Sequence, residues 1–167
     1  ELSWVQPFDF LPGYLSGLGI YSNYTIIVSR AKVSEPYSRT VQEPGTPPTT
    51  LNLGLTYDIG GFSMMMSGNY VEQHLESTNA DEFSNMYFDR YTESEFTLDI
   101  TMRQNITENI QISLDLRNLL STPRDNYFLK PVDKDSYYIK NIKFSDGSIP
   151  HFLENYEMFG FNANLGL

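Results

Sequence analysis

Apolar and polar residues alternate with a period of two along much of the chain. Residues 51–59 place leucine, tyrosine and isoleucine at odd positions, with mostly polar or small residues between them. Gly60-Gly61 follows, and a second alternating run continues to Tyr70. Two such runs joined by a glycine pair are typical of a β-hairpin with one apolar and one polar face.

The same alternation predicts further strands on both sides of this hairpin. The clearest are residues 95–103 and 110–118, which we expect to be joined by a tight turn at 104–109. A long strand is expected over 18–33, a weak one near 2–8 and a last one over 155–167. No stretch shows a competing helical period, so the sequence predicts an all-β fold of about seven strands.

The predicted connections alternate between short and long. The long ones cover residues 34–48, 72–90 and 119–153, and they are rich in proline or in polar residues. In an up-and-down antiparallel sheet, every second connection lies at the same end, so all the long loops should gather at one end. Short turns at one end and long loops at the other are typical of outer-membrane β-barrels.

Strand length and the position of aromatic residues agree with a membrane barrel. Eleven residues rising ~3.3 Å each and tilted ~45° span about 25 Å, which is the height of the apolar band of such a barrel. Aromatic residues near the predicted strand ends would form its interfacial girdles: Tyr24, Tyr57, Phe62, Tyr70 and Tyr91.

The polar face decides where the apolar face points. Asn52, Asp99, Asp115 and Arg117 make this face too polar for the core of a small barrel. We therefore expect these residues to face a wet lumen or a plug, with the apolar face toward lipid. Two alternatives remain open: a small complete outer-membrane barrel with a structural or adhesive role, and a soluble lipocalin-like ligand-binding barrel.

The composition excludes some classes of function. The 167 residues are 40% hydrophobic, 14% aromatic and 19% charged, with a formal net charge of −10 and no cysteine. Such a charge excludes a general nucleic-acid-binding surface, because no basic patch could neutralise phosphates. The absence of cysteine from this sequence excludes disulfides and thiol chemistry within it.

Candidate chemistry is sparse, and we expect neither an enzyme nor a metal or cofactor site. His74 and His151 fall in the long connections without metal-ligand spacing, so we interpret them as solvated loop residues. Asp99 and Asp115 could be a catalytic carboxylate pair, but lumen positions explain them as well. Aromatic residues with nearby polar groups suit contact with a sugar or siderophore, or simply pack the loops: Phe83, Tyr87, Phe88, Tyr127, Phe128, Tyr137 and Tyr138.

Four segments in order resemble the C-terminal barrel of TonB-dependent outer-membrane receptors. They are FDFLPGYLSGLGIYSNYT (8–25), LNLGLTYDIGGFSMMMSGNY (51–70), RYTESEFTLDITMRQNITENIQISLDLRNLLSTPRDNYF (90–128) and the closing YEMFGFNANLGL (156–167). Each motif alone is weak, whereas their order and spacing over nearly the whole chain are more specific.

The resemblance implies a transmembrane up-and-down barrel of 22 strands, of which residues 1–167 supply about the last seven. It implies active transport of a scarce nutrient, such as a ferric siderophore, haem, cobalamin or a saccharide, across the bacterial outer membrane. The implied partners are the rest of the barrel, its plug domain, the TonB energy-transducing complex and outer-membrane lipids. Whether a surface lipoprotein caps the barrel stays open.

The chain also departs from the family pattern. It contains no plug domain and no TonB box, and it lacks a starting methionine, so we interpret it as part of a longer protein. The resemblance makes Phe161, Leu165 and Leu167 part of the barrel-closing strand. However, this strand ends at Leu167 and not at the aromatic residue that is usual in the family.

Overall fold

The computed structural model describes residues 1–33, 38–78, 80–81, 86–87, 89–129, 151–157, 160 and 162–166. These residues form strands and one short 3-10 helix, η1 (Gly13–Gly17). The strands are β1 (Leu2–Pro7), β2 (Leu18–Ile26), β3 (Ala31–Val33), β4 (Arg39–Val41), β5 (Thr49–Ile59), β6 (Phe62–Val71), β7 (His74–Ser77), β8 (Ala80–Asp81), β9 (Met86–Tyr87), β10 (Asp89–Thr92), β11 (Glu95–Thr107), β12 (Ile110–Arg117), β13 (Arg124–Leu129), β14 (His151–Glu157) and β15 (Asn162–Gly166).

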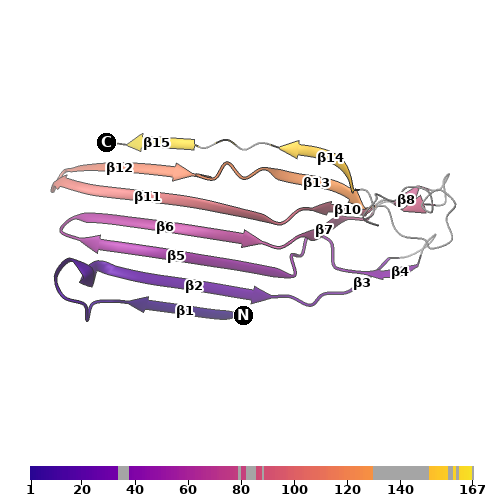
Figure 1. Ribbon diagram of the computed structural model, residues 1–167, viewed down its shortest axis with the longest axis horizontal. Helices are drawn as coiled ribbons and strands as arrows, with labels where there is room; N and C mark the ends of the chain where they lie inside the picture. Colours follow the sequence, from indigo (N-terminus) through magenta and orange to yellow (C-terminus); the bar gives the residue numbers. More distant parts are fainter. Residues whose placement is uncertain are drawn as a thin grey trace, which may run out of the picture.

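Seven strands form one antiparallel sheet, here called the main sheet, in the order β1-β2-β5-β6-β11-β12-β15 (Figure 1). Because the spatial order follows the chain order, the main sheet is an up-and-down meander. The all-β prediction is confirmed and the main sheet has the seven strands expected, but the described residues form eight further strands that were not predicted as separate strands. The sheet is open, with β1 and β15 as its two edges.

The hairpin expected at residues 51–70 is present as β5 and β6. Gly60 and Gly61 form its turn with φ angles of 58° and 82°, which a side-chain-bearing residue adopts only with strain. The register pairs Ile59 with Phe62 and continues to Thr50 opposite Val71. The alternating apolar residues therefore share one face along the full length of the hairpin.

Two predicted element boundaries between residues 18 and 109 were wrong. The strand expected over 18–33 ends at Ile26, and β3 begins a separate hairpin. Pro47 and Pro48 precede the neighbouring strand β5 and have no N–H groups, so the ladder cannot continue beyond the bond from Ile27 N–H to the Pro48 oxygen (2.8 Å). The turn expected over 104–109 is shorter, because β11 continues to Thr107 in pairing with β12.

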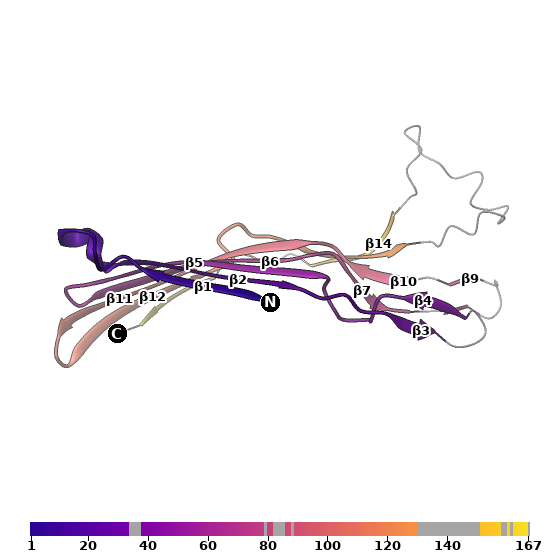
Figure 2. The same cartoon turned by 90° about the horizontal axis from the view of Figure 1, so that it is seen from below.

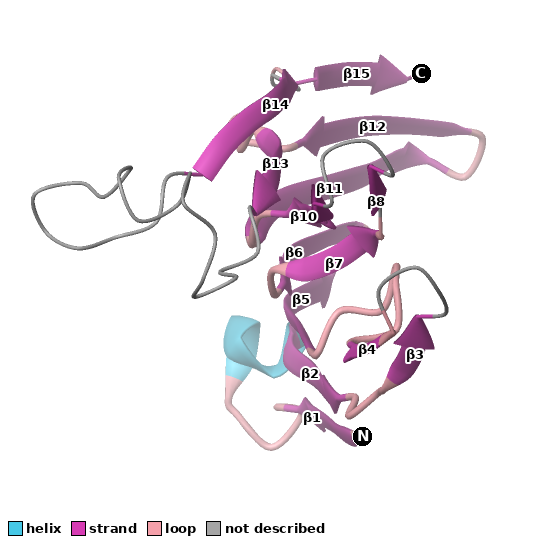
Figure 3. Cartoon of the chain, turned by 90° about the vertical axis from the view of Figure 1, so that its right-hand side faces the viewer, coloured by secondary structure: helices cyan, strands magenta, loops and turns pink. Residues whose placement is uncertain are grey.

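The long connections gather at one end of the main sheet, as predicted, but they are not plain loops (Figure 1). They contain the hairpin β3–β4, the pair β8–β9 and a second antiparallel sheet of order β14-β13-β10-β7, here called the distal sheet. The order of these four strands matches that of β15, β12, β11 and β6 in the main sheet. Four strands of the main sheet are thus prolonged, after interruptions, into the distal sheet, which Figure 3 shows end-on.

The main sheet is a single layer, as its edge-on view in Figure 2 shows. Among the described elements, η1 contacts β5 near the short-turn end, and otherwise the substantial contacts are between hydrogen-bonded strands. Among the described hydrophobic residues, Leu75 of β7 alone is fully buried. The packed centre of the described chain therefore lies in the distal region, and the main sheet leaves both faces uncovered.

Candidate functional site

The apolar face of the main sheet forms continuous rows across the strands. Strand register aligns the apolar positions directly opposite one another from β2 to β15. Two such rows are Leu18, Tyr57, Met64, Met102, Leu114 and Leu165, and Ile20, Leu55, Met66, Ile100, Leu116 and Ala163. Nothing in the described structure covers this face. Leu165 of the first row is 75% exposed, and Leu53 and Phe96, which lie on the same face outside the two rows, are 48% and 41% exposed.

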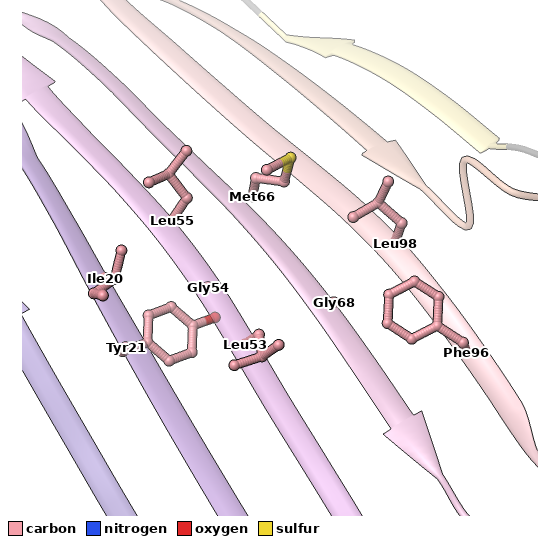
Figure 4. A pocket seen from close by; sticks show the side chains of 9 residues that line it. All are labelled: Ile20, Tyr21, Leu53, Gly54, Leu55, Met66, Gly68, Phe96 and Leu98. Carbon is pink, nitrogen blue, oxygen red and sulfur yellow. The ribbon is translucent and has the colours of Figure 1, made fainter.

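A shallow apolar hollow of about 320 Å³ lies at the middle of the main sheet (Figure 4). Gly68 lies between its register partners Leu53 and Leu98. A side chain at this position would approach the Phe96 ring, whose Cζ lies 2.9 Å from a Cβ built there. The lining residues of the apolar face are Ile20, Leu53, Leu55, Met66, Gly68, Phe96 and Leu98. Tyr21 and Gly54, which strand alternation assigns to the opposite face, complete the lining. Nearly all of them are apolar, so the hollow offers packing and little hydrogen bonding.

The opposite face carries the four polar residues that the sequence singled out. Asn52 lies between Asn23 and Asn69 in the register. Asp115 lies opposite Thr101, and strand alternation places Asp99 and Arg117 on the same face. The register places these residues on one face, whereas their position toward a lumen or plug stays a prediction. Nothing in the register aligns Asp99 with Asp115 as a directly opposed carboxylate pair.

Asp99 has a defined structural partner. Its Oδ1 accepts a hydrogen bond from the backbone N–H of Asn118 at 2.8 Å. Asn118 adopts a left-handed φ of 50°, and its own Oδ1 accepts a bond from the Thr122 N–H at 3.0 Å. Asp99 therefore helps to fix the irregular segment between β12 and β13, a role that sequence reasoning missed.

The aromatic ligand-binding candidates are only partly brought together. Tyr127 and Phe128 lie on β13, in register with Tyr91 and Arg90 of β10. Tyr87 lies on β9 and pairs with Ala80 in a separate two-stranded sheet. Four further candidates lie outside the described residues: Phe83, Phe88, Tyr137 and Tyr138. Tyr127 and Phe128 thus belong to a strand of the distal sheet, and Tyr87 belongs to a strand of the β8–β9 pair.

The prediction of a single strand over 155–167 was wrong: residues 155–157 belong to β14 in the distal sheet, and only β15 joins the main sheet as its last strand. Leu165 pairs with Leu114 of β12 and is 75% exposed, because β15 is the edge of the main sheet. Phe161 and Leu167 lie outside the described residues. The described part of this strand therefore has an unpaired edge available to a further strand.

A packed polar cluster in the distal region was not anticipated. Arg39 of β4 forms an ion pair with Asp89 of β10, and both side chains are largely buried. Burial and the nearby Asp89 carboxylate raise the pKa of Tyr91, while the Arg39 charge opposes this shift. Leu75 lies opposite Tyr91 in the register and is fully buried. The signals in the sequence were a lone leucine and opposite charges within polar segments.

His74 belongs to no group of metal-ligating side chains among the described residues, and the side chain of His151 lies outside the described part of the chain. His74 lies on β7, partly buried, with its Nδ1 3.2 Å from the Glu72 backbone oxygen. It is therefore more enclosed than a solvated loop residue, because its segment forms a strand of the distal sheet. In the part of the chain that the structure describes, no three histidine, aspartate or glutamate side chains are grouped to hold a metal ion.

Helices of membrane-spanning length and apolarity do not occur among the described residues. Comparisons of the chain with protein-family models, with curated proteins and with solved structures found no match.

Proposed function

We propose that this chain is the C-terminal barrel region of a TonB-dependent receptor that imports a scarce nutrient across the bacterial outer membrane. One observation carries the proposal: a single-layer antiparallel sheet presents a continuous apolar face that no described element covers. Removing apolar surface from water is favourable by about 25 cal/mol per Å². Lipid is the cover that requires no further protein layer.

Strand dimensions support the same proposal. β5 has 11 residues and β11 has 13. At ~3.3 Å per residue and a tilt of ~45°, 11 residues span about 25 Å, the height of the apolar band of a membrane barrel. The polar face, with Asn52, Asp99, Asp115 and Arg117, would then line the interior against a plug domain.

The open edges supply the third argument. An unpaired backbone polar group in hydrocarbon costs several kcal/mol, so only closed barrels or helices span a bilayer. The outer edges of β1 and β15 would therefore pair with strands of a larger barrel. On this proposal the distal sheet lies outside the membrane, where Tyr127 and Phe128 are candidates for contact with the imported nutrient.

Site-directed spin labelling of the full-length protein in lipid vesicles tests which face meets lipid. Residues 1–167 contain no cysteine, so once any cysteine outside them is replaced, a single label can be attached at Leu53 or Leu55 on the apolar face, or at Asn52 or Thr56 on the polar face. We expect labels on the apolar face to collide mainly with dissolved oxygen. Labels on the polar face should be less accessible to oxygen.

If the labels at Leu53 and Leu55 are shielded from both oxygen and a water-soluble nickel complex, the apolar face is a protein core. That result would overturn the membrane proposal in favour of a soluble barrel. Transport is tested separately, by uptake of ferric siderophores, haem, cobalamin and oligosaccharides into cells with and without a proton uncoupler. Uptake that is insensitive to the uncoupler would contradict an energised receptor.

A further inference from the structure

Two consecutive long connections are joined by a buried ion pair. Arg39 belongs to the hairpin β3–β4, within the connection between β2 and β5. Asp89 begins β10, within the connection between β6 and β11. Their side chains are only 16% and 10% exposed. The two residues are 50 positions apart in the sequence. The ion pair therefore links two segments that the strand order alone does not hold together.

A backbone bond ties the same two connections at a second point. The Gly45 N–H donates to the Leu75 oxygen at 2.7 Å. Gly45 has a φ of 72° and follows β4, whereas Leu75 is the fully buried residue of β7. Beside this bond, β7 pairs with β10 through Leu75 and Tyr91. Segment 39–45 is thus fixed both to β7 and to β10.

The neighbouring charges complete the cluster. Arg90 Nε lies 3.1 Å from Glu76 Oε2, and this pair is more exposed than that of Arg39 and Asp89. The Tyr91 hydroxyl belongs to the same environment. Burial and the Asp89 carboxylate raise the pKa of Tyr91, and the Arg39 charge lowers it. Removing one partner of a buried ion pair leaves an uncompensated charge and is strongly unfavourable. Loss of either Arg39 or Asp89 should therefore weaken the attachment of β3–β4 to β10.

We propose that the Arg39–Asp89 ion pair is a lock that holds the β3–β4 hairpin onto the distal sheet. When the ion pair is formed, the two connections are held together at the end of the main sheet that carries the long connections. With the lock broken, the hairpin detaches while the main sheet stays intact. This conformational device is independent of which face of the main sheet meets lipid.

Hydrogen–deuterium exchange of the full-length protein in detergent tests the lock. The Gly45 amide reports directly on contact between the two connections, because it is bonded to Leu75. For Arg39→Met, which removes the charge but keeps an unbranched side chain, we expect exchange of segment 39–48 to be at least tenfold faster. Amides of β5 and β6 should be unchanged, which shows in the same sample that the variant has folded.

Lys32→Met is the matched control, because Lys32 lies on the same hairpin and is exposed. If Arg39→Met exchanges no faster than Lys32→Met at segment 39–48, the lock does not exist. Asp89→Asn should reproduce the effect, and the double variant should add little to either single one. If Arg39→Met does not assemble, Arg39→Lys should give a smaller but measurable acceleration, and its absence would equally overturn the proposal.

Discussion

The ring of Tyr21 lies over the Cα of Gly54, its cross-strand partner in the β2–β5 pair. A Cβ added at Gly54 would overlap this ring. Both residues belong to the polar face of the main sheet, where Tyr21 occupies the space that the glycine leaves. The absence of a side chain at Gly54 is therefore required by packing and not by a turn.

Gly54→Ala should destabilise the full-length protein by about 1–3 kcal/mol, because the ring must leave its position or the strands must separate. In Tyr21→Ala the space is free, so adding Gly54→Ala to that variant should cost much less. The free energy of unfolding in urea measures all three variants. Gly160→Ala is the control, since a Cβ there has no neighbour within 4 Å. Equal losses in the two backgrounds would contradict the packing argument.

Neighbouring positions on β6 test the orientation of the main sheet. Met66 belongs to the apolar face and Ser67 to the polar face, at nearly the same depth along the strand. If the apolar face meets lipid, Met66→Arg should destabilise the protein in vesicles by about 2–4 kcal/mol, as lipid-facing arginine does near the midplane of a barrel. Ser67→Arg should cost clearly less. The urea concentration at the midpoint of refolding into vesicles is measured for both variants. Equal midpoints would count against a lipid-facing apolar face.

The main sheet could be predicted because its residues are locally periodic. The alternation around Gly60-Gly61 determines the turn, the register and the two faces of the β5–β6 hairpin at once, since a one-residue slip would exchange the faces. The same reasoning placed Asn52 and Asp115 correctly on the polar face. These predictions depend only on residues that are close in the sequence, so long-range contacts did not alter them.

The distal region could not be predicted in the same way. The pairing of Arg39 with Asp89 joins residues 50 positions apart, and neither segment has an apolar period. β10 has the sequence DRYT, which is strand-forming here because β7 and β13 flank it. Leu75 is buried by these long-range contacts and not by a local pattern. A lone leucine and opposite charges within polar segments were the only signals of this packed centre in the sequence.

Asp99 provides a test of a polar-face residue whose role is local. Its carboxylate accepts the Asn118 N–H, so Asp99→Leu should leave this N–H without its acceptor and cost about 1–3 kcal/mol. Asp99→Asn keeps an acceptor oxygen and should cost less. Urea unfolding of the full-length protein measures both variants. Asp115→Leu, on the same face, is the control, and a loss as large as that of Asp99→Leu would show that the Asn118 bond is not the cause.

Tyr91 makes the distal region sensitive to alkaline pH. Burial and the Asp89 carboxylate raise the pKa of Tyr91 above its ordinary value of about 10. Below pH ~10 the hydroxyl is protonated in both the folded and the unfolded state, so its contribution to stability is fully present. As the pH rises further, the unfolded state loses this proton first, and the free energy of unfolding falls.

Tyr91→Phe should remove this part of the pH dependence. We expect the loss of stability between pH 9 and pH 11, measured by urea unfolding, to be smaller in Tyr91→Phe than in the unsubstituted protein. Tyr14→Phe is the control, because Tyr14 is 79% exposed near the short-turn end and far from the distal cluster. The tyrosinate absorbance that is missing in Tyr91→Phe should be the part that appears above pH ~10 in the unsubstituted protein. If the missing absorbance appears at pH ~10 or below, Tyr91 is not held in the half-buried environment beside Asp89 that the structure gives it.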